Sequence, residues 1–193
     1  MANEIFLIRH GETAWSISGQ HTSRTDLPLT EEGRLRAAAL KEKLAGREFA
    51  LVLSSPMRRA LETGQLSGYE PVVDPNLHEW DYGAYEGLTS EQIHQTAPEW
   101  TIWNGTPPGG ESAEQVGARA DLVIRRALGN FGEGDVAIFG HGHMLRVLAA
   151  RWLELAPTDG RLFALDTGTV SVLGWEHTAR VIHIWNEGAG TAA

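Results

Sequence analysis

Two short apolar runs of β-favouring residues each end abruptly at a histidine that is followed by glycine. Residues 4–8 (EIFLI) lead into RHG at His10, and residues 136–139 (VAIF) lead into GHGH at His141. Such runs are typical of buried strands. In open parallel sheets, ligands bind beyond the carboxyl ends of the strands. We therefore expect the two histidines to lie at one binding site.

The rest of the chain alternates strand and helix patterns. Further strands are expected at residues 51–53, 71–73, 161–165, 170–175 and 181–185. Helices are expected at residues 30–44, 56–66, 112–128 and 144–153, with a brief one starting at Thr89. This alternation predicts a three-layer α/β sandwich, a mostly parallel sheet flanked by helices, in one domain covering residues 1–193. A loose tail is expected at residues 188–193.

Several helix starts carry residues that cap helices well. Thr30 precedes two glutamates, which suit the positive end of a helix dipole. Ser55 precedes Pro56, a favoured first helical residue. Two further starts have the spacing of a capping box, Thr89 with Gln92 and Ser112 with Gln115.

Charge and composition exclude several kinds of partner. The 193 residues carry a formal net charge of -9, which argues against general binding to nucleic acid or to anionic membranes. Without cysteine, the chain has neither disulfides nor thiolate metal sites. No targeting segment or membrane-spanning run stands out, so a cytoplasmic location is expected. An anionic substrate would need a local cluster of cations.

The expected strand ends supply such a cluster. Arg9 precedes the first histidine, and the strand at residues 51–53 leads to Arg58 and Arg59. The loop after the third strand brings the carboxyl group of Glu79. Arginine forks and histidine N–H donors can hold the oxygens of a phosphoryl group during its transfer. These residue types predict phosphoryl chemistry.

A histidine nucleophile fits this setting. It must be neutral, and a reference pKa of roughly 6.5 makes the neutral form accessible near neutral pH. Neighbouring arginines should lower that pKa further. The phosphohistidine formed can be discharged by water, and a protonated carboxylic acid can supply the leaving alkoxide with its proton.

Four segments in the correct order resemble the histidine phosphatase (phosphoglycerate mutase-like) superfamily. They are IRHGETAWS (8–16), SPMRRALET (55–63), EWDYG (79–83) and GHGHMLR (140–146). The likeness covers nearly the whole chain. It implies a phosphoglycerate mutase-like fold and an enzyme that needs no metal and no cofactor.

The resemblance also implies roles for single residues. His10 is identified as the nucleophile that becomes phosphorylated. Arg9, Arg59 and His141 are expected to bind the transferring phosphoryl group. Glu79 is expected to act first as the general acid and then as the base that activates water.

Other assignments are less direct. The resemblance implies that backbone N–H groups near Thr22, Ser23 and Gly142 line the pocket, together with Ser16, which stands where the mutases have Asn. Asp81 is close enough in sequence to serve as the acid instead of Glu79.

A few basic and histidine residues have open roles. His143 is interpreted as a supporting donor rather than a catalytic group or a metal ligand, because no further ligand follows at a suitable spacing. Arg24 and Arg146 are each left between a place in the pocket and a surface salt bridge.

One departure from the family decides between hydrolysis and mutase activity. Residues 88–112 contain no Arg or Lys, whereas the mutases carry a paired-arginine clamp in this region. A mutase must hold its intermediate while the intermediate turns round, so hydrolysis of a small phosphorylated metabolite is favoured. The alternatives are a phosphoglycerate mutase-type phosphotransferase and a protein directed at phosphopeptides or phosphohistidine.

The patterns W-S-x-S-G-Q-x-T and E-W-D-Y-G-x-Y-E-G look closest to small bacterial acid phosphatases and sedoheptulose-bisphosphatase-like enzymes. A sugar phosphate would suit the aromatic and polar rim expected from Trp15, His21, Arg24, His78 and Trp80. The oligomeric state stays open, and a homodimer is one state that the β-rich C-terminal half allows.

Overall fold

A mixed six-stranded sheet forms the centre of the computed structural model, which describes residues 3–44 and 47–188. The strands follow the order β3 (Val72–Val73), β2 (Phe49–Ser54), β4 (Asp135–Gly140), β1 (Ile5–Arg9), β5 (Thr169–Glu176) and β6 (Ala179–Gly188). The first four are parallel, while β5 runs antiparallel to β1 and β6 antiparallel to β5. The predicted α/β class with a mostly parallel sheet is confirmed, with an antiparallel hairpin at one edge.

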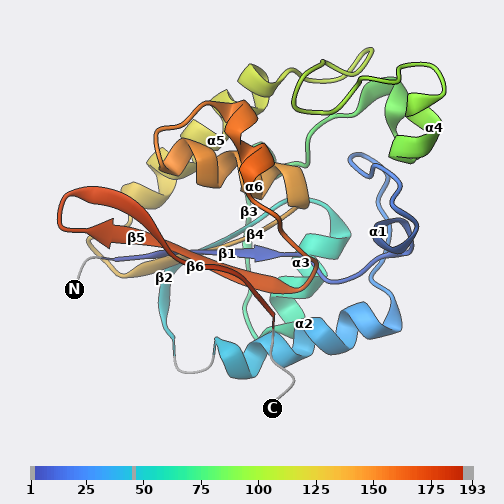
Figure 1. The fold of residues 1–193 in the computed structure, drawn as a ribbon. Helices are drawn as coiled ribbons and strands as arrows, with labels where there is room; N and C mark the ends of the chain where they lie inside the picture. The colour runs from blue at the N-terminus through green and yellow to red at the C-terminus, as the bar shows by residue number, and fades with distance from the viewer. Residues whose placement is uncertain (1–2, 45–46, 189–193) are drawn as a thin grey trace.

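Helices cover both faces of the sheet, as Figure 1 shows. The helices α2 (Glu31–Lys43) and α3 (Arg58–Leu66) lie on one face, and α5 (Ala113–Leu128) and α6 (Gly142–Trp152) on the other. Alternation along β1 explains both layers, because successive side chains of a strand point to opposite faces. Phe6 and Ile8 belong to the apolar cluster that includes the α2 residue Leu40. Ile5 and Leu7 belong to the cluster under α5 and α6.

The expected N-caps are present at three helix starts. Thr30 caps α2 by accepting the Gly33 N–H. Complete capping boxes join Thr89 to Gln92 at α4 (Ser90–His94) and Ser112 to Gln115 at α5. These caps satisfy backbone N–H groups that a helix start leaves without partners.

Two expected elements differ from the structure. The helix α3 has Met57 rather than Ser55 as its N-cap, and Pro56 precedes the helix. The strand expected at residues 161–165 is absent from the described chain, which there forms the 3-10 helix η3 (Pro157–Leu162) and an irregular segment. Leu162 is 64% exposed, so this apolar segment does not enter the core as a buried strand would.

Short elements complete the chain. The helix α1 (Ala14–Ser18) was not expected, and the 3-10 helices η1 (Pro75–Leu77) and η2 (Gly83–Tyr85) flank the Glu79 loop. Apart from Gly188 at the end of β6, the expected loose tail lies outside the described residues. None of the described helices has the length and apolar character needed to cross a membrane.

Candidate active site

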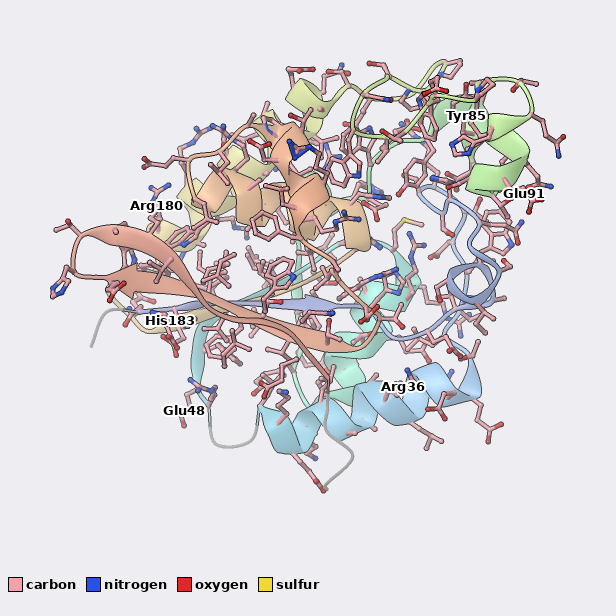
Figure 2. All side chains as sticks on the ribbon, viewed as in Figure 1. Arg36, Glu48, Tyr85, Glu91, Arg180 and His183 are labelled. Atoms are coloured by element: carbon pink, nitrogen blue, oxygen red, sulfur yellow. The ribbon has the colours of Figure 1, made fainter. Side chains whose placement is uncertain are left out.

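A polar cavity of about 250 Å³ opens beyond the carboxyl ends of β1 and β4. Its walls come from the loop after β1, from α1 and the chain after it, from the Glu79 loop, and from the start of α6. The chain after α1 is tied to the start of α4 by an isolated bridge between Gln20 and Thr89. In Figure 2 the labels of Glu91 and Tyr85 locate α4 and η2, although neither of these two side chains lines the cavity.

His10 lines this cavity with its backbone fixed on three sides. Its own N–H donates to Gly140 O (3.0 Å), its carbonyl accepts from Gly168 N–H (3.0 Å), and Gly11 N–H donates to Thr63 Oγ1 (3.0 Å). The ring Nδ1 lies 2.7 Å from Gly11 O. Because a carbonyl oxygen only accepts, Nδ1 carries the proton and Nε2 keeps the lone pair that a nucleophile needs.

The surroundings of His10 keep its ring neutral. Burial is the largest cause, followed by the positive charges of Arg59 and Arg9, and together they hold the pKa of His10 well below its ordinary value. Both causes act against the charged imidazolium. The neutral histidine expected from the sequence is therefore supported by its environment.

Two glycines allow the His10 loop to pack directly on the start of α2. A Cβ at Gly11 would lie 2.5 Å from Gly33 O, and a Cβ at Gly33 would lie 2.3 Å from Glu12 O. Such distances do not occur between real atoms of these kinds, so neither position accepts a side chain without a backbone shift. The close contact holds the loop that carries His10.

Arg9 brings a guanidinium group to the same cavity. Its Nη1 donates to Leu165 O, whereas its buried Nε has no hydrogen-bond partner among the described residues. The guanidinium carbon would lie only 3.2 Å from a Cβ at Gly142, the first residue of α6. Helix N-termini and guanidinium groups both favour anions, so this corner of the cavity suits phosphoryl oxygens.

Arg59 and His141 lie together behind His10. Arg59 Nε donates to His141 Nδ1 (3.2 Å), His141 Nε2 lies 2.7 Å from Ser55 Oγ, and the rings of His10 and His141 are 5.1 Å apart. Both side chains are fully buried, and neither lines the cavity. The remaining guanidinium nitrogens of Arg59 donate to carbonyls of Thr22, Ser23 and Thr25. The structure thus brings these two of the three predicted phosphoryl ligands beside His10, where both also bond to protein groups.

Glu79 also lines the cavity, and backbone groups hold its carboxyl. Oε1 accepts the N–H groups of Trp80 and Met144 at 2.8 Å each, and Oε2 accepts the His143 N–H at 3.0 Å. Two of these donors belong to α6, the helix that begins beside Arg9. The carboxyl is therefore fixed relative to the anion-binding corner.

Asp81, the alternative acid, does not line this cavity. Its Oδ2 accepts two hydrogen bonds from Arg24, and its Oδ1 accepts the Gly83 N–H. Burial alone would raise the pKa of Asp81, but the Gly83 and Arg24 contacts outweigh it and the pKa is lowered. Asp81 is thus held ionised outside the cavity, and Arg24 forms a salt bridge.

His143 lines the cavity and pairs with Tyr82. Its Nδ1 lies 2.6 Å from Tyr82 Oη, while its neighbour His141 turns to Ser55 instead. Burial, then Arg146 and His21, holds the pKa of His143 well below its ordinary value. Within residues 3–44 and 47–188, no group of three or more potential ligand side chains is arranged to hold a metal ion.

The other expected pocket residues divide into two groups. Ser16, Thr22 and Gly142 line the cavity, whereas Ser23 does not. The Ser23 N–H donates to both carboxylate oxygens of Glu86 at 2.9 Å, which removes it from the anion site. The expectation that this N–H faces the cavity is not met in the structure.

The expected rim divides in the same way. Trp15 and His21 line the cavity, but Arg24 and His78 line a smaller neighbouring one of about 170 Å³. Trp80 is fully buried and donates its indole N–H to Glu111 O (2.8 Å). It packs in the core instead of forming the rim.

Sequence reasoning missed several residues of the cavity. Gln20, Tyr82 and Leu165 line it although no motif assigned them there. Tyr82 could have been found from its place in the EWDYG segment, which also holds Glu79. Leu165 was missed because residues 161–165 were expected to form a strand. Thr63 supports the His10 loop from the SPMRRALET segment.

Comparison with known proteins identifies the family. The model of the histidine phosphatase superfamily, branch 1, matches residues 5–188. An acid phosphatase of Mycobacterium tuberculosis is 40% identical over 185 residues, which cover 94% of this chain and 91% of that protein. A sedoheptulose 1,7-bisphosphatase of Saccharomyces cerevisiae is 33% identical over 181 residues, which cover 77% of this chain and 67% of that protein.

A solved structure of an open reading frame product of Mycobacterium tuberculosis superposes with a TM-score of 0.94. It is 39% identical, and the match covers 97% of this chain and 99% of that chain. These findings confirm the superfamily, and the two relatives are of the two kinds that the sequence patterns suggested. The chain therefore belongs to branch 1 of the histidine phosphatase superfamily.

Proposed function

We propose that this phosphatase hydrolyses a small phosphorylated sugar or a similar metabolite through a phosphohistidine formed at Nε2 of His10. One observation carries the proposal. A neutral imidazole with its lone pair on Nε2 lines a cavity that also holds the guanidinium of Arg9 and the carboxyl of Glu79. Nucleophile, anion-binding group and acid thus share one small site.

In the first step, the Nε2 lone pair attacks phosphorus while the bond between phosphorus and the ester oxygen breaks. Arg9 and the start of α6 balance the charge on the phosphoryl oxygens. Glu79 gives its proton to the departing alkoxide. Arg59 and His141 support the nucleophile from behind, and direct binding of phosphate by the ring of His141 would require exchange of a present partner.

In the second step, the carboxylate of Glu79 takes a proton from water, whose oxygen attacks phosphorus. The bond between Nε2 and phosphorus breaks, which releases phosphate and restores the neutral imidazole. The three N–H groups bound to Glu79 hold its two carboxyl oxygens in place for this step. Glu79 gives up a proton in the first step and takes one from water in the second, so it ends the cycle in the form in which it began.

The size and lining of the cavity support a small substrate. About 250 Å³ accommodates a compact phosphate ester, and the aromatic face of Trp15 together with polar groups suits a sugar. The names of the relatives, an acid phosphatase and a sedoheptulose bisphosphatase, support the same class. The lack of Arg and Lys in residues 88–112 supports hydrolysis over mutase activity.

The test is phosphate release from sugar phosphates, phosphoglycerates and p-nitrophenyl phosphate, from acid to neutral pH and with a strong chelator. We expect chelator-resistant release that His10→Ala eliminates. His183→Ala is a matched control, since His183 contacts Glu4 at the other end of β1 and is labelled in Figure 2. Full activity of His10→Ala would refute the mechanism. Interconversion of phosphoglycerates without phosphate release would favour the mutase alternative.

Three further points belong to the proposal. Residues 1–193 act as one domain, which agrees with a family match over residues 5–188. The enzyme works in the cytoplasm, either as a monomer or as a homodimer. Size-exclusion chromatography with light scattering decides between those two states.

A further inference from the structure

Most basic side chains of this acidic protein are paired with carboxylates. In the described part of the chain, five have no carboxylate oxygen within 4.0 Å: Arg9, Arg59, Arg125, Arg146 and Lys41. Lys41 and Arg125 are exposed to solvent. The other three surround the candidate active site, and Arg146 has no role in the steps above.

Arg146 lines the cavity in a fixed orientation. Its Nε donates to Gly160 O (3.1 Å), and its guanidinium carbon lies 4.6 Å from the ring centre of Trp103. A Cβ at Gly160 would lie 2.8 Å from the Trp103 ring, so these groups pack closely. A guanidinium held in this way loses little conformational entropy when it binds a ligand.

The same guanidinium still has a free donor. Its Nη2 makes one long hydrogen bond to Arg161 O (3.4 Å), and its Nη1 has no hydrogen-bond partner among the described residues. A partly buried guanidinium without a counter-charge is costly, and an anion that pairs with it recovers that cost. Trp103 and Gly160 orient the group but do not neutralise it.

The spacing along α6 places this donor apart from the phosphoryl site. The guanidinium of Arg9 lies beside Gly142, the first residue of α6. Arg146 follows Gly142 by four residues on the same helix. Four residues advance a helix by about 6 Å and return to nearly the same face. That separation fits an anionic group a few bonds away from the phosphorylated oxygen of one small substrate.

We propose that Arg146 forms a second anion subsite, which selects phosphate esters whose alcohol part carries a carboxylate or a further phosphate. The inference rests on the proposed function, because the first phosphoryl group is held beside His10. A single guanidinium distinguishes this site from the paired clamp of the mutases. It binds the alcohol part of a substrate without having to hold a freely turning intermediate.

The test compares matched substrates that differ by one anionic group. One pair is 3-phosphoglycerate against glycerol 3-phosphate, and the other is fructose 1,6-bisphosphate against fructose 6-phosphate. The first pair probes a carboxylate and the second probes a further phosphate. For wild type we expect a higher kcat/KM for the anionic member of at least one pair.

In Arg146→Gln this preference should fall about 10-fold or more, mainly through KM, because a charge-assisted hydrogen bond is lost. Arg146→Lys should keep part of the preference, since it keeps the charge but loses the planar fork. Arg125→Gln, on the exposed face of α5, is the matched control and should leave both ratios unchanged. An equal loss for both members of each pair would indicate a structural role and overturn the subsite.

A binding experiment separates this inference from the proposed function. Affinities of both pairs for His10→Ala, with and without Arg146→Gln, can be measured by calorimetry without turnover. Tighter binding of the anionic member that Arg146→Gln abolishes supports the subsite, even if wild type releases no phosphate and the proposed function fails. Equal affinities within both pairs overturn the subsite, even if hydrolysis is observed.

Discussion

The carboxyl group of Glu79 is bound to the first turn of α6, with its Oε1 2.8 Å from the backbone nitrogen of Met144. The helix that begins beside Arg9 therefore also positions the proposed general acid. Because α6 contacts both Arg9 and Glu79, the helix fixes the distance between the proposed anion site and the proposed acid. Any replacement of Glu79 also removes an acceptor from the backbone N–H groups of Trp80, His143 or Met144.

Glu79→Gln should slow phosphorylation of His10 by about 10²–10⁴-fold for substrates with poor leaving groups. Glutamine lacks the transferable proton, and its amide nitrogen cannot accept the N–H groups that both glutamate oxygens now accept. The loss should be smaller for p-nitrophenyl phosphate, whose leaving group needs little protonation. Rapid-quench measurement of the phosphoenzyme tests this, and an equal loss for both substrates would contradict the acid role.

Much of the fold could be predicted because local signals agree with the tertiary structure. The apolar runs at residues 4–8 and 136–139 became β1 and β4, and the capping boxes at Thr89 and Ser112 start α4 and α5. The helix α1 was missed because five residues are too few for a periodic pattern, although Thr13 and Ser16 form its capping box.

The candidate site was harder to predict where long-range partners decide the outcome. Nothing local separates Arg24 from Arg146, yet Arg24 pairs with Asp81 while Arg146 lines the cavity. Trp80 resembled a rim residue because it adjoins Glu79, but it is fully buried and its indole N–H donates to the carbonyl of Glu111. Such partners come from distant parts of the chain, and a single sequence does not show their pairing.

Gly11→Ala should lower the free energy of unfolding by about 1–3 kcal/mol and reduce activity. The added Cβ would lie 2.5 Å from Gly33 O, so the His10 loop must move away from α2. Urea denaturation and phosphate release measure the two effects. Gly132→Ala is the control, because a Cβ there meets nothing within 4 Å. Unchanged stability of Gly11→Ala would show that the loop adapts without loss.

His10 should be neutral at pH 6.5, with its proton on Nδ1. Burial and the charges of Arg59 and Arg9 lower its pKa, so the neutral form persists below the pH at which an ordinary histidine is half protonated. Nitrogen NMR of the free enzyme reports charge and tautomer, and loss of the signals in His10→Gln assigns them. A ring protonated on both nitrogens at pH 6.5 would refute the proposed resting state.

Stability should fall when the pH is lowered from 7 toward 5. Burial is the main cause that lowers the pKa of His10, His141 and His143 in the folded protein, whereas the unfolded chain binds protons near the ordinary value of about 6.5. Below that value the unfolded state binds more protons, so the free energy of unfolding decreases with falling pH, by up to roughly 1.4 kcal/mol per pH unit for each histidine. Above pH 7 these groups should add no pH dependence.

Urea denaturation at a series of pH values measures this slope. Carboxylates with a lowered pKa, such as that of Asp74, titrate below this window, so the histidines dominate it. His143→Gln removes one of the three groups and should reduce the slope by up to the contribution of one proton. A free energy of unfolding that stays constant between pH 7 and 5 would mean that these histidines accept protons in the folded protein, and that burial does not hold His10 neutral for attack.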